Sequence, residues 1–422
     1  MATPLFLGLD FGTSGARACV IAANGEIEDM ARMAFGEPAD DVSAAAWREV
    51  LSELIAQIPV GLRKRLAALA VDGTSATLLA CDGDLRPLHP PLAYHDGRAV
   101  AEAQCIAAAA GPDHPAAAAT SGLAKAMWLS SRIGQGRTAV FLNQADWLGA
   151  LLSGRPVSDS HNALKMGLDP VSNRWPAWLA SLIDIAALPQ PVRPGEAVGL
   201  VDRAHAVSFG IPTDCLVRAG TTDSIAAFLA TGVDRPGEAV TSLGTTLVLK
   251  LLSEVHVESG AYGIYSHWFG RLWLTGGASN AGGGVLRQFF ADDELAALSA
   301  RIDPQRDSGL DYYPLIRPGE RFPIRDPHLM PRLQPRPTDR AEFLHALLEG
   351  LARIEALGYR RLAELGATPP TRVVSCGGGS RNPNYMRMRE RILGVPVTRS
   401  HQDEACYGAA RLACHGAGLF PA

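Results

Sequence analysis

The sequence lacks the signals of several common classes of protein. Its 39 Lys and Arg residues nearly balance 43 Asp and Glu residues, for a net charge of -4. The chain therefore lacks the excess of positive charge that binding to nucleic acid or an anionic membrane requires. No segment approaches the ~20 apolar residues of a membrane-spanning helix. The apolar start of the chain ends at Asp10, too soon for a secretory signal peptide. These absences predict a cytoplasmic protein without nucleic-acid or membrane partners.

Cysteine is sparse and unpatterned. The seven cysteines include no Cys-x-x-Cys pair and are odd in number, which argues against a zinc site and against a disulfide framework. Cys19 and Cys414 have apolar neighbours, where a thiol packs as a small core residue. Three further patterns are absent, so the sequence gives no support to the functions that they carry. They are a Ser-His-Asp order, a His-Glu-x-x-His motif and a Gly-x-Gly-x-x-Gly turn opening a βαβ unit.

The chain does have enough apolar residues for a large core. Hydrophobic residues make up 47% and charged residues 19%, a balance that excludes disorder throughout. At roughly 150 residues per domain, 422 residues predict two or three domains. The 43 Gly and 29 Pro residues predict many tight junctions between strands and helices.

Two distant segments share one pattern. Residues 5–22 and residues 238–252 each have the pattern strand, Gly-Thr turn, strand, which we interpret as an internal repeat. The other predicted elements alternate in type and indicate an α/β protein with two similar lobes joined near residues 233–237. They are strands at 66–72, 138–142 and 215–219, helices at 44–57, 100–109 and 223–231, and a long helix through 343–354 that begins with a capping box of Asp339 and Glu342.

Three glycine-rich turns have the composition of phosphate-binding loops. They lie at residues 10–15 (Asp-Phe-Gly-Thr-Ser-Gly), 243–246 (Leu-Gly-Thr-Thr) and 376–382 (Cys-Gly-Gly-Gly-Ser-Arg-Asn). Small residues let backbone N–H groups converge on a phosphate, and a nearby carboxylate such as Asp10 positions magnesium. Each turn alone is more often an ordinary structural turn. Together they favour nucleotide binding at a cleft between the lobes.

Asp223 is the candidate catalytic group. A carboxylate at the start of a helix is most often a cap, and that reading is sufficient on local grounds. Asp223 also follows a predicted buried strand and a Gly-Thr turn, the usual place for a catalytic group in an α/β fold. Phosphoryl transfer to a hydroxyl needs a base beside the acceptor, and Asp commonly serves.

The motifs together resemble the FGGY family of carbohydrate kinases, within the superfamily of actin-like and hexokinase-like ATPases. Residues 7–14 are similar to its first phosphate loop, residues 219–223 to its catalytic aspartate motif and 238–245 to its second phosphate loop. Residues 309–315 with 319–323 resemble its signature region. Residues 377–382 and 404–409 resemble its adenosine loop and its returning C-terminal helix. The resemblance covers nearly the whole chain.

The resemblance is closest to the short cyanobacterial and plant members described as D-ribulose kinases. The segments that carry it include residues 15–18, 72–75, 144–148, 161–165, 223–227 and 274–280. Two segments depart from the wider family. Residues 72–76 (Asp-Gly-Thr-Ser-Ala) replace a Gln-Met-His type motif, so the sugar contacts of those relatives cannot be carried over. The usual Trp-x-Asp-x-Arg segment appears as residues 94–98 (Tyr-His-Asp-Gly-Arg), and whether His95 and Asp96 border a sugar or lie in a solvated loop stays open.

The resemblance implies two actin-like (ribonuclease H-like) lobes with a central cleft. The sugar-binding lobe would comprise residues 1–230, completed by a helix at 404–422, and the ATP-binding lobe residues 231–403. The expected reaction is phosphorylation of a ketopentose, most of all D-ribulose to D-ribulose 5-phosphate, with ATP and Mg²⁺, in a monomer or homodimer. Asp223 would be the general base and Asp10 the metal-orienting group. The sugar site would contain Asp10, Ser14, Gly15, Ala16, Arg17, Ser75 and Asp223, and the ATP site Thr13, Ser14, Gly244, Thr245, Gly378, Gly379, Asn382 and Tyr385.

Two alternatives remain at this point. One is a kinase of the same family that acts on D-xylulose or a polyol. The other is a non-catalytic, nucleotide-binding regulatory protein of the actin-like superfamily, which would not need an acid such as Asp223 beside a sugar hydroxyl.

Overall fold

The computed structural model describes residues 3–35, 43–133 and 139–421, and their contacts divide the chain into two compact units. Unit 1 runs from the N-terminal segment to Gly232 and includes Glu404–Phe420. Unit 2 is Val233–Asp403, with Pro421. Each unit has one six-stranded mixed sheet.

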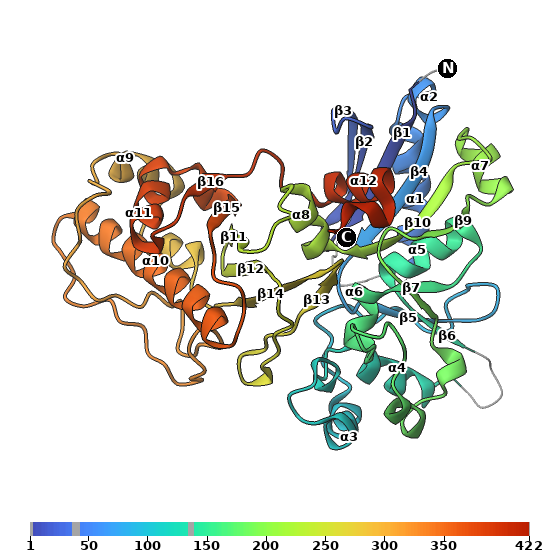
Figure 1. The fold of residues 1–422 in the computed structure, drawn as a ribbon, viewed down its shortest axis with the longest axis horizontal. Helices are drawn as coiled ribbons and strands as arrows, with labels where there is room; N and C mark the ends of the chain where they lie inside the picture. The colour runs from blue at the N-terminus through green and yellow to red at the C-terminus, as the bar shows by residue number, and fades with distance from the viewer. Residues whose placement is uncertain (1–2, 36–42, 134–138, 422) are drawn as a thin grey trace. The chain divides into compact units, whose positions relative to one another are not determined.

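The sheet of unit 1 has the strand order β3-β2-β1-β4-β10-β9 (Figure 1). The first three strands along the chain form an antiparallel meander, and β4 and β10 then continue the sheet parallel to β1. The edge strand β9 is antiparallel to β10. The bounds are β1 Leu5–Phe11, β2 Gly15–Ala22, β3 Ile27–Ala34, β4 Leu66–Gly73, β9 Ala197–Leu200 and β10 Leu216–Thr222.

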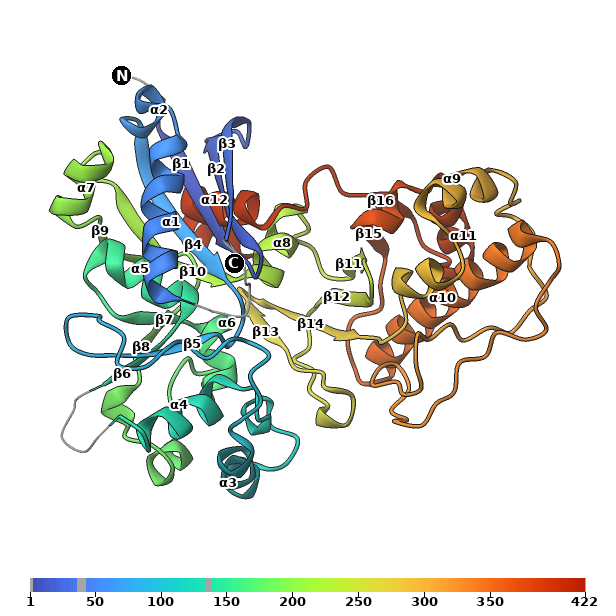
Figure 2. The ribbon, with the colours of Figure 1, turned by 180° about the vertical axis from the view of Figure 1, so that it is seen from behind.

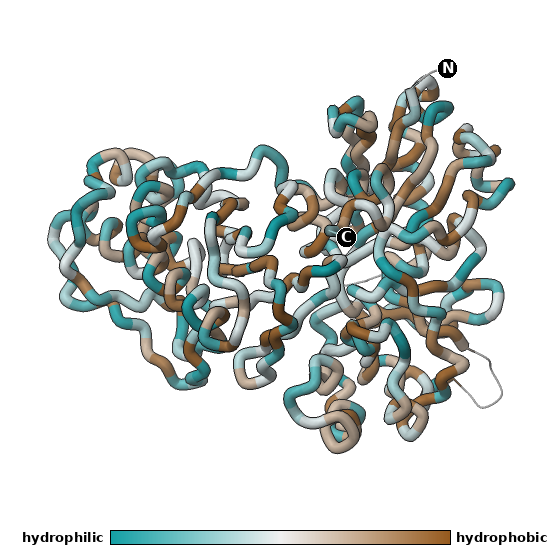
Figure 3. The backbone as a smooth tube through the Cα atoms, in the orientation of Figure 1, coloured by the Kyte–Doolittle hydropathy of each residue, from teal (hydrophilic) through white to brown (hydrophobic). Residues whose placement is uncertain are grey.

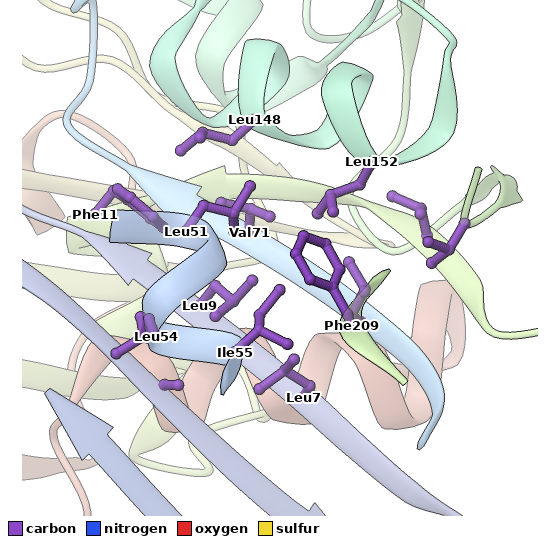
Figure 4. Packing of buried hydrophobic residues seen from close by; sticks show 14 of the residues in the cluster. Leu7, Leu9, Phe11, Leu51, Leu54, Ile55, Val71, Leu148, Leu152 and Phe209 are labelled. Carbon is purple, nitrogen blue, oxygen red and sulfur yellow. The ribbon is translucent and has the colours of Figure 1, made fainter. Parts of the chain in front are cut away.

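Helices cover both faces of this sheet. Helix α1 (Ala44–Gln57) packs on one face, and α8 (Asp223–Ala230) and α12 (Ala405–His415) pack on the other (Figures 1 and 2). Figure 4 shows alternate side chains of β1 meeting one face of α1. The strand period of two and the helix period of 3.6 therefore bury two complementary apolar surfaces. The labelled residues are Leu7, Leu9 and Phe11 of β1 and Leu51, Leu54 and Ile55 of α1, all buried.

The opposite face of β1 carries Gly8 and Asp10 and lies under α12. A Cβ atom at Gly8 would stand 2.1 Å from the backbone N of Ala410 and from the backbone O of Cys406, so only glycine allows this approach. Cys19 and Cys406 are buried together on this face, as the apolar setting of Cys19 predicted. The segment that returns from unit 2 thus builds the layer behind Asp10.

The remaining elements of unit 1 lie around two apolar clusters: α5 and α7 pack in the cluster of β1 and α1, and α3 and α4 pack in a second cluster. In Figure 3 the strands of unit 1 are mostly coloured as hydrophobic residues, and the outer loops are mostly coloured as hydrophilic or neutral residues. The elements are α2 Val60–Arg63, β5 Leu78–Cys81, α3 Val100–Ala110, α4 Gly122–Ser130, β6 Val140–Asn143, α5 Gln144–Ser153, β7 Val157–Asp159, α6 Ser160–Ala163, β8 Gln190–Val192 and α7 Arg203–Phe209.

The sheet of unit 2 has the order β13-β14-β12-β11-β15-β16, in which β14-β12-β11-β15-β16 repeat the arrangement of β3-β2-β1-β4-β10 and β13 is added beside β14. Its β11–β12 hairpin corresponds to β1–β2, and β15 and β16 continue the sheet parallel to β11. The predicted internal repeat is therefore confirmed. The elements are β11 Glu238–Leu243, β12 Leu247–Ser253, β13 His267–Phe269, β14 Leu272–Ala278, β15 Arg372–Cys376, β16 Val397–Arg399, α9 Asp292–Ala300, α10 Arg340–Glu364 and α11 Pro383–Leu393.

The local predictions hold, although several bounds differ by a few residues. The predicted helix at 44–57 has those bounds, and the strand predicted at 215–219 extends to Thr222. Of the strand predicted at 138–142, β6 begins at Val140 and residue 138 lies outside the described residues. Asp339 caps α10 as predicted. The second half of the predicted capping box was wrong, because the Glu342 side chain pairs with Arg306.

None of the helices in the described part of the chain combines the length and the hydropathy that crossing a bilayer requires.

Candidate active site

Three parallel strands of the unit 1 sheet bring three carboxyl groups together at their C-terminal ends. In the register Asp10 of β1 pairs with Asp72 of β4, and Asp72 pairs with Thr221 of β10. Asp223 follows two residues after Thr221 as the first residue of α8. Because parallel strands end on the same side, their following loops form one site there.

Asp10 is held by a cation from the adjacent strand. Arg17 Nη1 donates to Asp10 Oδ2 at 3.1 Å, and Arg17 Nε lies 3.6 Å from Glu404 Oε2, just before α12. Asp10 is only 4% exposed, whereas the Arg17 side chain is 36% exposed. The ion pair sets the orientation of the Asp10 carboxylate and leaves the arginine accessible.

Asp72 is a carboxyl group that the sequence prediction did not include. It is fully buried, and no protein N–H or neutral hydroxyl reaches either of its oxygens. Burial raises the pKa of Asp72 well above its usual value, and the charges of Asp10 and Asp223 raise it further, against the opposing charge of Arg17. Burial and the two neighbouring carboxylates therefore favour the protonated form of Asp72.

This assignment predicts how stability depends on pH. The unfolded chain ionises Asp72 near its ordinary pKa, whereas the native chain holds the proton, so the contribution of Asp72 to stability falls as pH rises between those two values. Asp72→Asn removes the loss. We expect the variant to be more stable than the parent at pH 7, by about 1.4 kcal/mol for each unit by which the native pKa exceeds the unfolded one, and to match the parent near pH 4.

The measurement is thermal unfolding of both proteins across pH 4–8. Asp84→Asn is the matched control, because the Asp84 side chain is 75% exposed and pairs only at the surface with Arg86. A parent and an Asp72→Asn variant whose stabilities differ by the same amount at every pH would show that Asp72 is ionised in the native state.

Asp223 lies where a general base would be placed. It is partly exposed, and its Oδ1 accepts a hydrogen bond from the backbone N of Ser224 at 2.6 Å. As the first residue of α8 it is stabilised as a carboxylate by the helix dipole. The N-cap itself is Thr222, so the cap assigned to Asp223 from sequence was one residue off. Beneath it, the buried His161 Nδ1 and Thr221 Oγ1 lie 2.8 Å apart.

The turn that follows β4 presents Ser75. The start of this turn is fixed by Gln144 of α5, whose Oε1 accepts hydrogen bonds from the N and Oγ1 atoms of Thr74 at 3.0 and 2.9 Å. Ala76 has a φ of 64°, a left-handed conformation that is strained for a residue with a Cβ. Ser75 stands half-buried between these two anchors.

The turn between β1 and β2 leaves Thr13 and Ser14 exposed. The N of Gly12 donates to the O of Gly15 at 3.0 Å, which closes the turn. A Cβ atom at Gly15 would stand 2.3 Å from the O of Met33, so packing of β2 on β3 already explains that glycine. Ala16 is 1% exposed and belongs to the core beside α1, so only its backbone is available to a substrate.

The corresponding turn of unit 2 contains Gly244 and an exposed Thr245. It is covered by the segment after β14, because the N atoms of Gly283 and Gly284 donate to the O atoms of Gly244 and Thr245 at 2.9 and 3.1 Å. The buried Glu320 fixes the start of that segment through Ser279 Oγ at 2.6 Å and the N of Asn280 at 2.7 Å. Sequence reasoning gave Glu320 no role, since its partners are about 40 residues away.

The third glycine-rich turn follows β15, also in unit 2. Gly378 is exposed with nothing within 4 Å of a Cβ position, whereas Gly379 packs against Leu243. Asn382 is already engaged: its Oδ1 accepts from the N of Tyr385 at 3.0 Å and caps α11, and its Nδ2 donates to Ser299 Oγ at 2.7 Å. Tyr385 is 3% exposed in the core of unit 2, so its ring has almost no surface for an adenine. We therefore do not retain Tyr385 in the site.

These features define a two-lobed sugar kinase fold, and comparisons with known proteins agree. The xylulose kinase from Lactobacillus acidophilus has this fold, with a TM-score of 0.84 at 18% identity over 99% of this chain and 90% of that one. Models of the N-terminal and C-terminal domains of the FGGY family of carbohydrate kinases match residues 5–230 and 239–417. The chain belongs to the FGGY family of carbohydrate kinases.

Relatives within the family differ in their sugars. A xylulose kinase of Streptomyces coelicolor is 27% identical over 431 residues, which cover 93% of this chain and 84% of the relative. A gluconokinase of Bacillus subtilis is 22% identical over 470 residues, with 99% and 88% covered. The protein is thus an ATP-dependent carbohydrate kinase, a phosphotransferase acting on an alcohol group.

Proposed function

We propose that the enzyme transfers the γ-phosphoryl group of ATP to a terminal hydroxyl of a ketopentose, above all D-ribulose, to give D-ribulose 5-phosphate. The observation that carries the proposal is the C-terminal end of the central strands of unit 1, where Asp10 lies near the end of β1, Asp223 follows β10 and Ser75 stands on the turn after β4. The hydroxyls of a sugar can donate hydrogen bonds to the two carboxylates and accept one from the Ser75 hydroxyl. The reaction also needs one carboxylate with access to the attacking hydroxyl.

In this proposal unit 1 binds the sugar and Asp223 is the general base. Its partly exposed carboxylate takes the proton of the terminal hydroxyl as that oxygen attacks phosphorus. Ser75 and Arg17 contact the sugar, with Asp10 beside them and the backbone of residues 14–16 along the phosphate path. Water that reached the same site would compete for the phosphoryl group, so exclusion of water accompanies catalysis.

Unit 2 binds ATP in the same proposal. Gly244 and Thr245 supply N–H groups and a hydroxyl for its phosphates. Gly378 and Gly379 give the adenosine a surface without side chains, and Asn382 shapes that surface by capping α11.

Magnesium is proposed as the metal that accompanies ATP. No group of three or more His, Cys, Asp and Glu residues arranged for a metal ion occurs among the described residues. A magnesium ion held by phosphate oxygens and water needs fewer protein ligands, and the buried carboxylate of Asp10 suits that demand. When bound, the ion neutralises charge on the transferring phosphate.

Asp10→Asn tests this role. The amide is a weaker magnesium ligand and removes the partner of Arg17, so we expect the magnesium concentration for half-maximal activity to rise about tenfold. The measurement is a magnesium titration at saturating ATP and sugar. An unchanged magnesium requirement would leave Asp10 as only the ion-pair partner of Arg17.

The choice of D-ribulose rests on the turn at residues 73–76. Its small side chains leave few contacts, so Asp10, Ser75 and Asp223 decide which epimer is accepted. D-xylulose is the second candidate, because xylulose kinases are among the relatives. The experiment is a coupled assay of ADP release against D-ribulose, D-xylulose, glycerol and gluconate. Sugar-dependent ADP release with a ketopentose supports the proposal, and release only with glycerol or gluconate, or with none of the four, refutes it.

A further inference from the structure

A buried ammonium group joins two loops at the proposed sugar site. Lys125, on α4, has no exposed surface. Its Nζ donates to the backbone carbonyl oxygens of Ala76 at 2.8 Å, of Ala93 at 2.7 Å and of Tyr94 at 3.3 Å. All three protons of the ammonium group are therefore used by backbone carbonyls rather than by a carboxylate.

The first loop is the turn that carries Ser75. Its start is anchored by Gln144 through Thr74, and its end, at Ala76, is anchored by Lys125. The left-handed conformation of Ala76 is unfavourable for an alanine and persists only where neighbouring contacts hold it. Lys125 supplies a contact of this kind through its bond to the carbonyl oxygen of Ala76.

The second loop comprises residues 93–98. The N of Asp96 donates to the O of Ala93 at 2.9 Å, and Arg98 closes the loop with its Nε on Asp96 Oδ1 at 2.9 Å. Lys125 accordingly binds the first two carbonyls of this loop while binding Ala76. The two loops are 17 residues apart along the chain and share one buried side chain.

We propose that Lys125 is a positioning residue for the sugar: it fixes the Ser75 turn and the loop 93–98 as one wall of the sugar site. The inference rests on the proposed function of that site. Burying a charge without an ionic partner is costly, and a Met or Leu would pack at this position without the cost. What the ammonium adds is a fixed geometry for three carbonyls, which an apolar side chain does not supply.

The ionisation of Lys125 gives the proposal a signature in pH. Burial lowers the pKa of Lys125 to about 8, the charge of Asp96 raises it and the charge of Lys165 lowers it. Those two groups are the charges that act on Lys125. A neutral amine has two N–H donors for three carbonyls, so one carbonyl loses its bond as pH rises through 8. The KM for the sugar should rise there, and the KM for ATP should not.

The central variant is Lys125→Met, with Arg132→Met as matched control. Arg132 is an exposed arginine just after α4; it stacks on Trp128, whose ring also faces Arg98 of the loop 93–98, and its hydrogen bonds go to Trp128 and Ser131 of its own segment. With the sugar that the parent phosphorylates best, we expect Lys125→Met to raise the KM for sugar about tenfold while the KM for ATP stays within twofold. Arg132→Met should keep both parent values. A sugar KM within twofold of the parent, or an equal rise in both KM values, would overturn the proposal.

The pH profile covers the case in which Lys125→Met fails to fold. The parent should show a rise in sugar KM between pH 7 and 9.5 at constant ATP KM, and a flat profile would overturn the proposal. Where Lys125→Met folds, its own profile should be flat.

Backbone hydrogen exchange tests the proposal without any substrate, so its result is separate from the proposed function. The amides of Thr77 and Asp96 are bonded within the two loops, to Thr74 O at 3.3 Å and to Ala93 O at 2.9 Å. Both should exchange faster in Lys125→Met than in the parent and in Arg132→Met. Unchanged exchange at both amides refutes the proposal even if the enzyme is active. An absence of sugar-dependent ADP release in the parent refutes the proposed function alone.

Discussion

Asp223→Ala lowers the sugar-dependent turnover of ATP by roughly two to four powers of ten, the usual contribution of a general base. The proposed base is a partly exposed carboxylate at the start of α8, directly after the C-terminal end of β10. Because ATP is proposed to bind mainly to unit 2, the affinity for ATP should stay within about threefold of the parent value. Single-turnover kinetics at saturating sugar and nucleotide titration are the two measurements.

The control for Asp223→Ala is Asp292→Ala. Asp292 is also an aspartate at the first position of a helix, α9, and it is exposed in unit 2. Both variants lose a favourable interaction with a helix dipole, and only Asp223→Ala loses the base. Turnover reduced equally in both variants, or unchanged in Asp223→Ala, would remove Asp223 from the chemical step.

Gly408→Ala destabilises unit 1 strongly, although alanine is the better helix former. A Cβ atom at Gly408 of α12 would stand 1.8 Å from the O of Ala226 in α8, and backbone cannot move aside as a flexible side chain would. Overpacking of this kind costs about 1–3 kcal/mol, more than the ~1 kcal/mol that alanine gains over glycine within a helix. The measurement is the midpoint of thermal or chemical unfolding.

Gly149→Ala is the matched control for Gly408→Ala. Gly149 lies in α5, and nothing stands within 4 Å of its Cβ position, so this variant should gain up to about 1 kcal/mol. The two substitutions thus shift stability in opposite directions. A Gly408→Ala variant as stable as the parent would mean that α8 and α12 do not pack as closely as described.

Strand ends and turns could be predicted from sequence because their signals are local. Asp10 and Asp223 each follow an apolar run and stand beside a Gly-Thr turn, and these patterns were enough to select them. The repeated hairpin was equally visible, because each copy has its own glycine and threonine in the turn. The structure adds that both copies belong to the same five-strand arrangement, β3-β2-β1-β4-β10 in unit 1 and β14-β12-β11-β15-β16 in unit 2.

Side chains whose partners are distant could not be predicted. Asp72 was read as part of a turn motif, and its raised pKa depends on burial and on Asp10, 62 residues earlier in the chain and next to it in the sheet. The bonds of Lys125 and Gln144 to the Ser75 turn span 49 and 70 residues. No local pattern carries such information.

Two side chains chosen from sequence have other tasks in the structure. Tyr385 follows the adenosine-loop motif and was expected to stack on adenine, yet its position on α11 turns it into the apolar core of unit 2. Asn382 was expected to contact adenosine directly, and both ends of its amide are bonded to protein. A motif fixes the backbone of a loop more reliably than the direction of its side chains.

The ratio of catalytic efficiencies for D-ribulose and D-xylulose, measured at saturating ATP, tests the central claim most directly. The two sugars differ in the direction of the C3 hydroxyl, and a site whose polar groups pair with one epimer leaves a buried group unpaired with the other. We predict that kcat/KM for D-ribulose exceeds that for D-xylulose about tenfold or more. A higher kcat/KM for D-xylulose would contradict the D-ribulose assignment.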